Sequence, residues 1–311
     1  MKYLVGARGS QLSLAQTNWV ISELKKKTPE AEFEIVPITT KGDTDARPLF
    51  TINQKGIFEK EIDKAVAEKI VDFAVHSLKD VPAELPDDLV LACIPKRESA
   101  NDIFISKDGN TLDTIKTGAV IGTSSLRRAV QISRKRPDVI VKPIRGNIET
   151  RIKKIGEGTF DGIVLAQAGI QRLGLDIKFE KLPVEVFMPS PGQGALAIVA
   201  RKDNSDVLAL LKKIEDPVSR NVIEAERSLS LFVDSGCRFP VGALASQNGN
   251  KLALNVTVYS VDGGKFISVR QDADSNQAKE LGKRVASELS AKGIEELAKN
   301  WREKVEEWNK K

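Results

Sequence analysis

The sequence contains few residues of the types that form disulfides or bind metals. Among 311 residues it has two cysteines, one histidine and 5% aromatic residues. Cys93 and Cys237 lie far apart and form no CxxC pair, which argues against a disulfide framework or a Cys/His metal site, and we expect no metal. His76 would have to serve as the sole base of any serine–histidine catalyst, which argues against that chemistry.

Long hydrophobic runs are also absent. No stretch approaches the roughly 18 apolar residues of a membrane span, and the start of the chain reaches Arg8 after a very short apolar run. A secretory signal needs a longer apolar region. We therefore expect a cytoplasmic protein with no membrane partner.

The positive charge is concentrated in one segment. The whole chain has a net charge of +5, whereas residues 127–154 alone contain ten Lys or Arg residues against Asp138 and Glu149. A basic segment of this kind indicates an anionic partner, either nucleic acid or a small molecule with several negative charges.

Short apolar runs alternate with amphipathic stretches, which is typical of an α/β protein. We predict strands at residues 2–7, 33–40, 72–77, 89–95, 102–106, 119–124, 139–144, 162–168 and 195–200. Helices are expected to begin near Ser10, Ile57, Ser125, Asn147 and Asp216. From about Asn255 the pattern changes to two alternating strands joined by a turn at 262–264, followed by a helical tail.

Clusters of turn-forming residues divide the chain near 95–102 and 188–195. If strand 195–200 returns to the first sheet, the first domain is discontinuous and two segments link it to the second. We therefore predict an α/β fold with two hinged domains like those of periplasmic binding proteins, a ligand cleft between them, and a smaller C-terminal α+β domain. The expected domains are residues 1–96 with 194–213, residues 100–190, and residues 217–311.

One local pattern recurs: a strand, a turn holding Ser or Asn with Arg, and then a helix. It occurs in VGARGSQLSLAQT, VIGTSSLRRAVQ and KPIRGNIETRIKK, and more weakly in LAQAGIQRLGL. The N–H groups and dipole of a helix start favour an anion, and arginine adds a planar fork that pairs with carboxylates. One such turn is usually structural, but four of them favour a surface that binds several carboxylates.

Three further residues need an explanation. Asp80 follows an apolar strand in AVHSLKDVP and precedes Val-Pro, which holds the chain extended and suits a side chain fixed at a strand end. A turn-forming Asp beside a solvated Lys79 is the plainer interpretation. Cys237, in FVDSGCRFPVGALA, is a lone thiol in a turn-like segment, where sulfur reacts unless it is buried or occupied. His76 and Cys93 are interpreted as packed core residues.

Together these segments closely resemble the hydroxymethylbilane synthase family, also called porphobilinogen deaminases. The resemblance runs in order through ARGSQLSLAQ, TKGDTD, KGIFEKEID, AVHSLKDVP, IGTSSLRRAVQ, IRGNIETRI, GIVLAQAGIQRLG, PSPGQGALAI and GCRFPVGALA. It covers most of the first 245 residues, whereas the tail beyond 250 matches only in length and pattern. The resemblance implies a transferase of tetrapyrrole (haem-type) biosynthesis. Such an enzyme adds four porphobilinogen molecules, each with loss of ammonia, to a bound primer, and water then releases hydroxymethylbilane.

The resemblance also implies a role for particular residues. Cys237 would carry the primer, a dipyrromethane cofactor, through a thioether, and Asp80 with the adjacent Lys79 would be catalytic. The implied cofactor-binding residues are Arg8, Ser10, Lys79, Thr123, Ser125, Arg127, Arg128, Arg145 and Arg151. The implied substrate-binding residues are Arg8, Gln16, Arg145, Arg151 and Arg172. Residues 44–55 resemble the family's mobile loop over the cleft.

Two other classes of protein remain as alternatives. A hinged solute-binding protein would have a similar architecture, but a reversible binder needs no covalent anchor such as Cys237. A nucleic-acid-binding protein would use residues 127–154, but the arginines lie at strand-to-helix turns and aromatic residues for base stacking are few. We expect a monomer that uses porphobilinogen and no nucleic acid.

Overall fold

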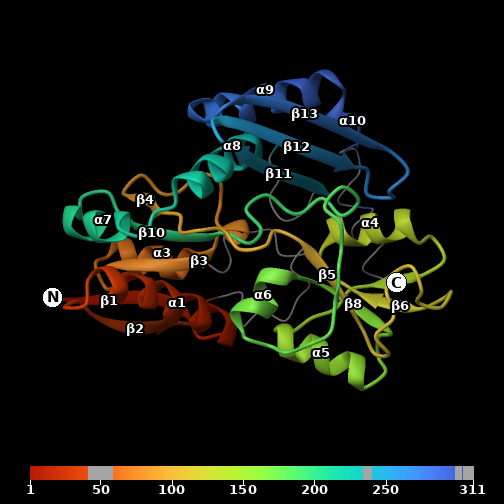
Figure 1. The fold of residues 1–311 in the computed structure, drawn as a ribbon, viewed down its shortest axis with the longest axis horizontal. Coiled ribbons are helices and arrows are strands. Elements are labelled where there is room, and N and C mark those ends of the chain that lie inside the picture. The colour runs from red at the N-terminus through yellow and green to blue at the C-terminus, as the bar shows by residue number, and fades with distance from the viewer. Residues whose placement is uncertain (41–58, 234–239, 298–302, 304–311) are drawn as a thin grey trace. The chain divides into compact units, whose positions relative to one another are not determined.

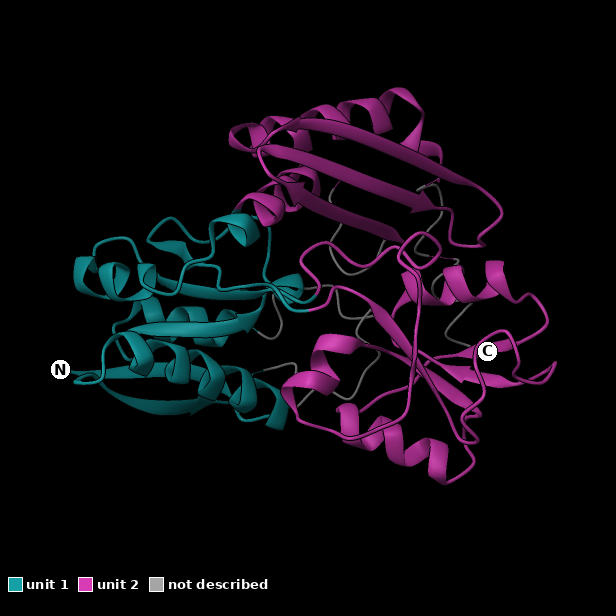
Figure 2. Ribbon diagram, viewed as in Figure 1, with its two compact units in different colours: residues 1–47, 54–98, 194–220 teal, residues 48–53, 99–193, 221–311 magenta. Residues whose placement is uncertain are grey.

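The computed structural model describes residues 1–40, 59–233, 240–297 and 303 (Figure 1). The helix start expected near Ile57, the loop expected at 44–55 and Cys237, which is expected to carry the cofactor, lie outside these residues. The chain forms two compact units, which Figure 2 shows in teal and magenta. The first comprises residues 1–47, 54–98 and 194–220, and the second residues 48–53, 99–193 and 221–311.

The first unit is built on a five-stranded sheet with the order β2-β1-β3-β10-β4. Its strands are β1 (Lys2–Arg8), β2 (Glu32–Ile38), β3 (Phe73–Ser77), β4 (Leu89–Cys93) and β10 (Leu196–Arg201). Strands β2, β1 and β3 are parallel, and β10 inserts antiparallel between β3 and β4. The prediction that strand 195–200 returns to the first sheet is therefore confirmed.

Helices cover both faces of this sheet. On one face, α1 (Gln11–Lys27) and α7 (Ser205–Lys212) pack against the buried side chains of Val75 and Ile198. On the other face, α3 (Lys60–Ala67) packs against the alternate strand residues Ala74 and Val199. This two-residue alternation of faces is the reason why β3 and β10 read as continuous apolar runs.

The second unit contains an analogous five-stranded sheet with the order β7-β6-β8-β5-β9. Its strands are β5 (Asp102–Ser106), β6 (Val120–Gly122), β7 (Ile140–Lys142), β8 (Gly162–Ala166) and β9 (Glu180–Lys181). Helix α4 (Leu126–Lys135) packs on one face through Ile132. Helices α5 (Ile148–Gly156) and α6 (Gln167–Arg172) pack on the other through Ile155 and Ile170. Strands β7, β6 and β8 are parallel, whereas β5 is antiparallel to β8 and β9.

A smaller antiparallel sheet completes the second unit. It has the order β11-β12-β13, with β11 (Val241–Asn248), β12 (Lys251–Tyr259) and β13 (Phe266–Asp274). Three helices accompany it: α8 (Pro217–Val233), α9 (Ala278–Ala291) and α10 (Ile294–Leu297). Helices α8 and α9 pack so closely that a Cβ on Gly282 would lie 2.6 Å from the carbonyl oxygen of Ala225, and glycine is required there.

The predicted fold class is confirmed: two α/β sheets with helices on both faces, and a smaller C-terminal sheet with helices. Helix α7 and strands β9 and β11 were not predicted, and strand 162–168 ends earlier, at Ala166, where α6 begins. Strand β9 has two residues, and alanine and polar residues give β11 a weak strand preference. The boundaries expected for three domains stay a prediction.

Candidate active site

In the first unit, the predicted site residues gather at one edge of the sheet. Strands β1 and β3 are parallel neighbours, with Gly6 paired to Ala74, so their carboxyl ends lie at the same edge. Arg8 ends β1 and is half-buried, and Lys79 with Asp80 follows the end of β3. The fold thereby places Arg8 and Asp80, which are 72 positions apart in the sequence, at the same edge of the sheet.

Asp80 lies on a turn that is fixed at both of its ends. Residues Leu78–Asp80 form one turn of 3-10 helix, closed by the bond from the Val81 amide to the Leu78 carbonyl at 3.0 Å. The amide of the buried Leu78 donates to the Ala195 carbonyl, also at 3.0 Å. Within the part of the chain that the structure describes, no hydrogen bond to the half-buried Asp80 carboxylate is recorded. The turn holds Asp80 at the carboxyl end of β3, and its predicted catalytic role stays a prediction.

Helix α1 adds two polar groups to the same edge. Ser10 is its N-cap and accepts a hydrogen bond from the Ser13 amide at 3.3 Å, as the sequence predicted. The buried Gln16 donates from Nε2 to Oγ of Ser77, the last residue of β3, at 2.9 Å. Gln16 therefore ties α1 to the strand that leads into the Asp80 turn, and its predicted contact with substrate stays a prediction.

In the second unit, the predicted residues follow the carboxyl ends of the parallel strands β6, β7 and β8. Thr123 and Ser125 stand between β6 and α4, and the Thr123 hydroxyl accepts the Ser125 amide at 3.2 Å. Ser125 is the N-cap by position, but its side chain makes no capping hydrogen bond. The first turn of α4 thus keeps N–H groups that its cap residue does not satisfy, which favours an anion at this helix start.

Arg127 and Arg128, in the first turn of α4, are buried against a carboxylate that the sequence analysis did not identify. Asp102 is fully buried, with Oδ2 at 2.8 Å from Arg127 Nη1 and Oδ1 at 2.7 Å from Arg128 Nη2. Burial alone would raise the pKa of Asp102, but the charges of the two arginines outweigh it and hold the pKa well below its usual range. The three groups together retain one positive charge.

Arg127 has a further unusual feature. Its Nη1 also donates to the carbonyl of Met188 at 2.8 Å and to Oε1 of Gln131 at 3.0 Å, while its Nε is buried without a hydrogen-bond partner. Burial lowers the pKa of Arg127, the charge of Asp102 opposes that shift, and the charge of Arg128 adds to it. Arg127 and Arg128, hereafter the arginine pair, are therefore held in place by hydrogen bonds to Asp102, Gln131 and the Met188 carbonyl.

Arg145 and Arg151 extend this positive region. Arg145 precedes Gly146, whose φ of 113° is a left-handed conformation that suits glycine, and Arg151 Nε donates to the Gly146 carbonyl at 2.8 Å. Burial and the like charges of Arg128 and Arg145 lower the pKa of Arg151 to about 10. A ligand with several negative charges would offset the repulsion among these guanidinium groups, and their role in binding stays a prediction.

The structure also gives the burial of Arg172, His76 and Cys93. Arg172 is half-buried at the end of α6. His76 is buried with Nε2 at 3.0 Å from Asp63 Oδ1, and burial raises the pKa of the Cys93 thiol, so both are confirmed as core residues. Helix α4, whose start was expected near Ser125, ends at Lys135, two residues before Pro137.

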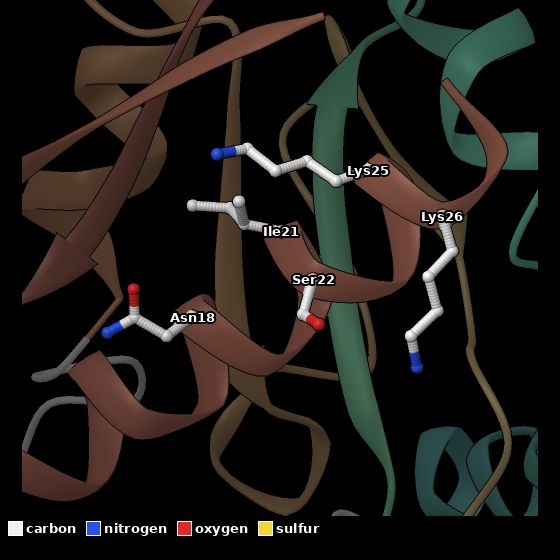
Figure 3. A pocket seen from close by; sticks show the side chains of 5 residues that line it. All are labelled: Asn18, Ile21, Ser22, Lys25 and Lys26. Carbon is white, nitrogen blue, oxygen red and sulfur yellow. The ribbon is translucent and has the colours of Figure 1, made fainter. Parts of the chain in front are cut away.

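The basic hollow on the surface of α1 is not the predicted site. Five residues line it, and none of them was singled out in the sequence (Figure 3): Asn18, Ile21, Ser22, Lys25 and Lys26. Among the residues that are described, no group of three Asp, Glu, His or Cys side chains is arranged to hold a metal ion. Over the same residues, no helix has the length and apolar character needed to cross a membrane.

Sequence reasoning missed Asp102, Gln131 and Gln193, which hold the arginine pair. Asp102 opens a largely apolar strand, and the PSPGQG segment around Gln193 was noted as rich in turn formers and as part of the resemblance, with no role given to Gln193. A charged residue at the first position of a largely apolar strand is the signal that could have identified Asp102, because such a group needs a buried partner.

Comparisons with known proteins agree over both units. The family model described as "Porphobilinogen deaminase, dipyromethane cofactor binding domain" matches residues 3–209, and "Porphobilinogen deaminase, C-terminal domain" matches residues 221–291. "Probable porphobilinogen deaminase" of Nitrosopumilus maritimus is 70% identical over 310 residues, covering 100% of both chains. "Porphobilinogen deaminase" of Brevibacillus brevis is 46% identical over 295 residues, covering 94% of this chain and 95% of the relative.

Solved structures give a more distant likeness. A probable amino-acid ABC transporter extracellular-binding protein from Bacillus subtilis covers 69% of this chain and 90% of its own, with 12% identity and a TM-score of 0.39. The assignment rests instead on the two family models and on the full-length relatives. The chain belongs to the porphobilinogen deaminase, or hydroxymethylbilane synthase, family of transferases.

Proposed function

We propose that this chain is a hydroxymethylbilane synthase that joins four porphobilinogen molecules head to tail on a covalently held dipyrromethane. In each addition the bond from the aminomethyl carbon to nitrogen breaks and ammonia leaves. A pyrrole α-carbon then attacks the resulting cation and gives up its proton. After the fourth addition, the bond between the methylene of the first added unit and the α-carbon of the dipyrromethane would break. Water would supply a hydroxyl group to that methylene and a proton to that α-carbon, which releases the linear tetrapyrrole.

The observation that carries the proposal is the cluster of Arg128, Arg145 and Arg151. Each pyrrole unit brings an acetate and a propionate, so the ligand offers many carboxylates. Burial, followed by the like charges of Arg128 and Arg145, lowers the pKa of Arg151, so the charged cluster costs the folded protein free energy that bound carboxylates would offset. The unsatisfied start of α4 and the buried, unpartnered Nε of Arg127 also fit a polyanionic group.

The residues present therefore fit a dipyrromethane. We assign its carboxylates to Arg128, Arg145 and Arg151 in the second unit and its thioether to Cys237. When bound, the group supplies the nucleophilic pyrrole carbon at which the chain grows. Bidentate guanidinium groups orient its carboxylates, which fixes the direction in which the pyrrole rings face.

Asp80 has the chemistry needed for the cationic step. A carboxylate fixed at a strand end stabilises the azafulvenium-type cation left by ammonia, and it accepts hydrogen bonds from pyrrole N–H groups. The adjacent Lys79 is assigned a supporting role, with its positive charge favouring the ionised form of that carboxylate.

Intact-mass spectrometry together with a turnover assay tests this function. The purified protein should exceed the mass of its polypeptide by one dipyrromethane and should release ammonia and a linear tetrapyrrole from porphobilinogen. Cys237→Ser should have the bare chain mass and no turnover, with Cys93→Ser as the matched thiol control that retains both. An active preparation at the bare chain mass would reject the covalent cofactor.

Replacing Arg151 with Leu should separate binding from stability. We expect KM for porphobilinogen to rise by about ten-fold or more, as for a lost charge-assisted hydrogen bond. The free energy of unfolding should stay equal or increase, because a like charge is removed from the cluster. Lys153→Leu removes an exposed positive charge from the same helix and should leave KM unchanged. Loss of stability in step with activity would instead identify Arg151 as a structural residue.

The pKa of Arg151 predicts a limit at alkaline pH. The guanidinium is charged below about 10, so carboxylate binding should be complete at neutral pH and weaken as pH rises through that value. We expect the KM of the wild-type enzyme to rise along this limb and that of Arg151→Leu to lack the same component. The expectations of a monomer, of the cytoplasm and of no nucleic-acid partner stay predictions.

A further inference from the structure

The side chain of Gln193 forms hydrogen bonds with both Asp102 and Arg128, although the sequence analysis did not single it out. Its side-chain Nε2 donates to the Asp102 carboxylate at 2.8 Å and to the Ala100 carbonyl at 2.6 Å. Its Oε1 accepts from Arg128 Nη2 at 3.2 Å. Gln193 is 1% exposed, so its amide bridges both members of a buried ion pair.

The Gln193 bridge adds to an unequal distribution of hydrogen bonds over the two carboxylate oxygens of Asp102. Oδ1 accepts from Arg128 Nε at 3.0 Å, from Arg128 Nη2 and from Gln193, whereas Oδ2 accepts from Arg127. The Gln193 amide thus keeps one carboxylate oxygen oriented toward Arg128 while its carbonyl fixes the rotation of the same guanidinium. Without Gln193, the Arg128 guanidinium would keep its bonds to Asp102 and to the Val164 carbonyl but would lose the acceptor that fixes Nη2 on its other side.

The segment that carries Gln193 is itself held by a second buried carboxylate. Glu226, on α8, is fully buried and accepts the Gly192 amide at 2.6 Å and the Ala245 amide of β11 at 2.8 Å. A continuous set of hydrogen bonds therefore runs from β11 through Glu226 and Gly192 to Gln193 and the arginine pair. Strand β11 begins at Val241, four residues after Cys237 in the sequence.

We propose that Gln193 is a positioning residue for Arg128, and that it fixes the guanidinium relative to strand β11 through Gly192 and Glu226. This inference rests on the proposed function, because it assigns the specific purpose of orienting a carboxylate-binding arginine. Gln193 does not touch the reacting atoms, so its effect should fall on binding of porphobilinogen and of the growing chain and not on the chemical step.

Two substitutions test the assignment in the full-length, cofactor-loaded enzyme. Gln193→Leu removes both hydrogen-bonding ends, and the isosteric Gln193→Glu retains size but sets a carboxylate against Asp102. Both should raise KM for porphobilinogen by about ten-fold, with kcat per loaded enzyme within about three-fold of wild type. Gln247→Leu is the matched control, because Gln247 bonds Asn221 and Gly249 away from the arginines, and it should leave KM unchanged.

The fraction of loaded enzyme, counted by intact mass, separates the outcomes. A positioning role requires a higher KM at normal loading and a normal unfolding midpoint in at least one of the two variants. Unchanged KM in both variants, or a fall in kcat that follows the unfolded fraction with KM unchanged, would overturn the assignment. Failure of the wild-type enzyme to consume porphobilinogen in the same assay would reject the proposed function instead.

Discussion

Asp80→Asn should lower turnover of porphobilinogen by about 10²–10³-fold, the range for loss of one fixed electrostatic stabiliser. Asparagine has nearly the same shape, so the turn that carries residue 80 should be retained. That turn is fixed by the Val81 and Leu78 backbone amides, neither of which involves the Asp80 carboxylate. What changes is the charge facing the cation after ammonia has left, and a neutral amide cannot balance it.

The comparison that isolates this effect is Asp88→Asn in the same unit. Asp88 is exposed, and the substitution makes the same change in charge at the start of β4. It should leave kcat unchanged, so any loss found only at residue 80 follows from its position. Intact mass should also show that Asp80→Asn retains its ligand, and wild-type turnover in that loaded variant would remove Asp80 from the mechanism.

Local rules predicted the elements of the first unit that carry Arg8, Ser10 and Asp80. A Ser before an amphipathic helix and a polar residue after an apolar strand are local signals, whereas the assignment of the three residues to one site followed from the family resemblance and stays a prediction. The β12–β13 hairpin was likewise encoded by strand alternation around the turn at residues 262–264.

The buried contacts of Arg127 and Arg128 in the second unit could not be predicted in the same way. Arg127 and Arg128 were expected to face ligand, because arginine at a helix start is a common anion site. The structure instead pairs both with Asp102, 25 and 26 residues earlier in the sequence. The pairing depends on β5 lying antiparallel beside β8, a long-range contact that no local pattern reveals. Their roles in holding the cofactor stay predictions.

Asp102→Asn should cost about 3–5 kcal/mol of unfolding free energy, the range found when one partner of a buried ion pair is removed. The amide retains the shape of the carboxylate but leaves two buried guanidiniums without a countercharge. Urea unfolding at neutral pH measures the loss. Asp274→Asn is the matched control in the same unit, because Asp274 pairs with Lys251 at 2.8 Å where both side chains are well exposed to solvent. Water screens that pair, so its loss should be far smaller.

The cause of the difference in unfolding free energy between wild type and Asp102→Asn can be identified from its pH dependence. The folded-state pKa of Asp102 lies below its ordinary value of 3.8, so the carboxylate contributes stability that is fully present above that value and is lost as pH falls through the folded pKa. The gap between wild type and Asp102→Asn should therefore be constant near neutrality and narrow only in strong acid. Adding Arg128→Leu to Asp102→Asn should recover part of the loss, because it removes one of the uncompensated charges. If this difference in unfolding free energy does not change in acid, or if the double variant is less stable than Asp102→Asn, packing around residue 102 matters more than its charge.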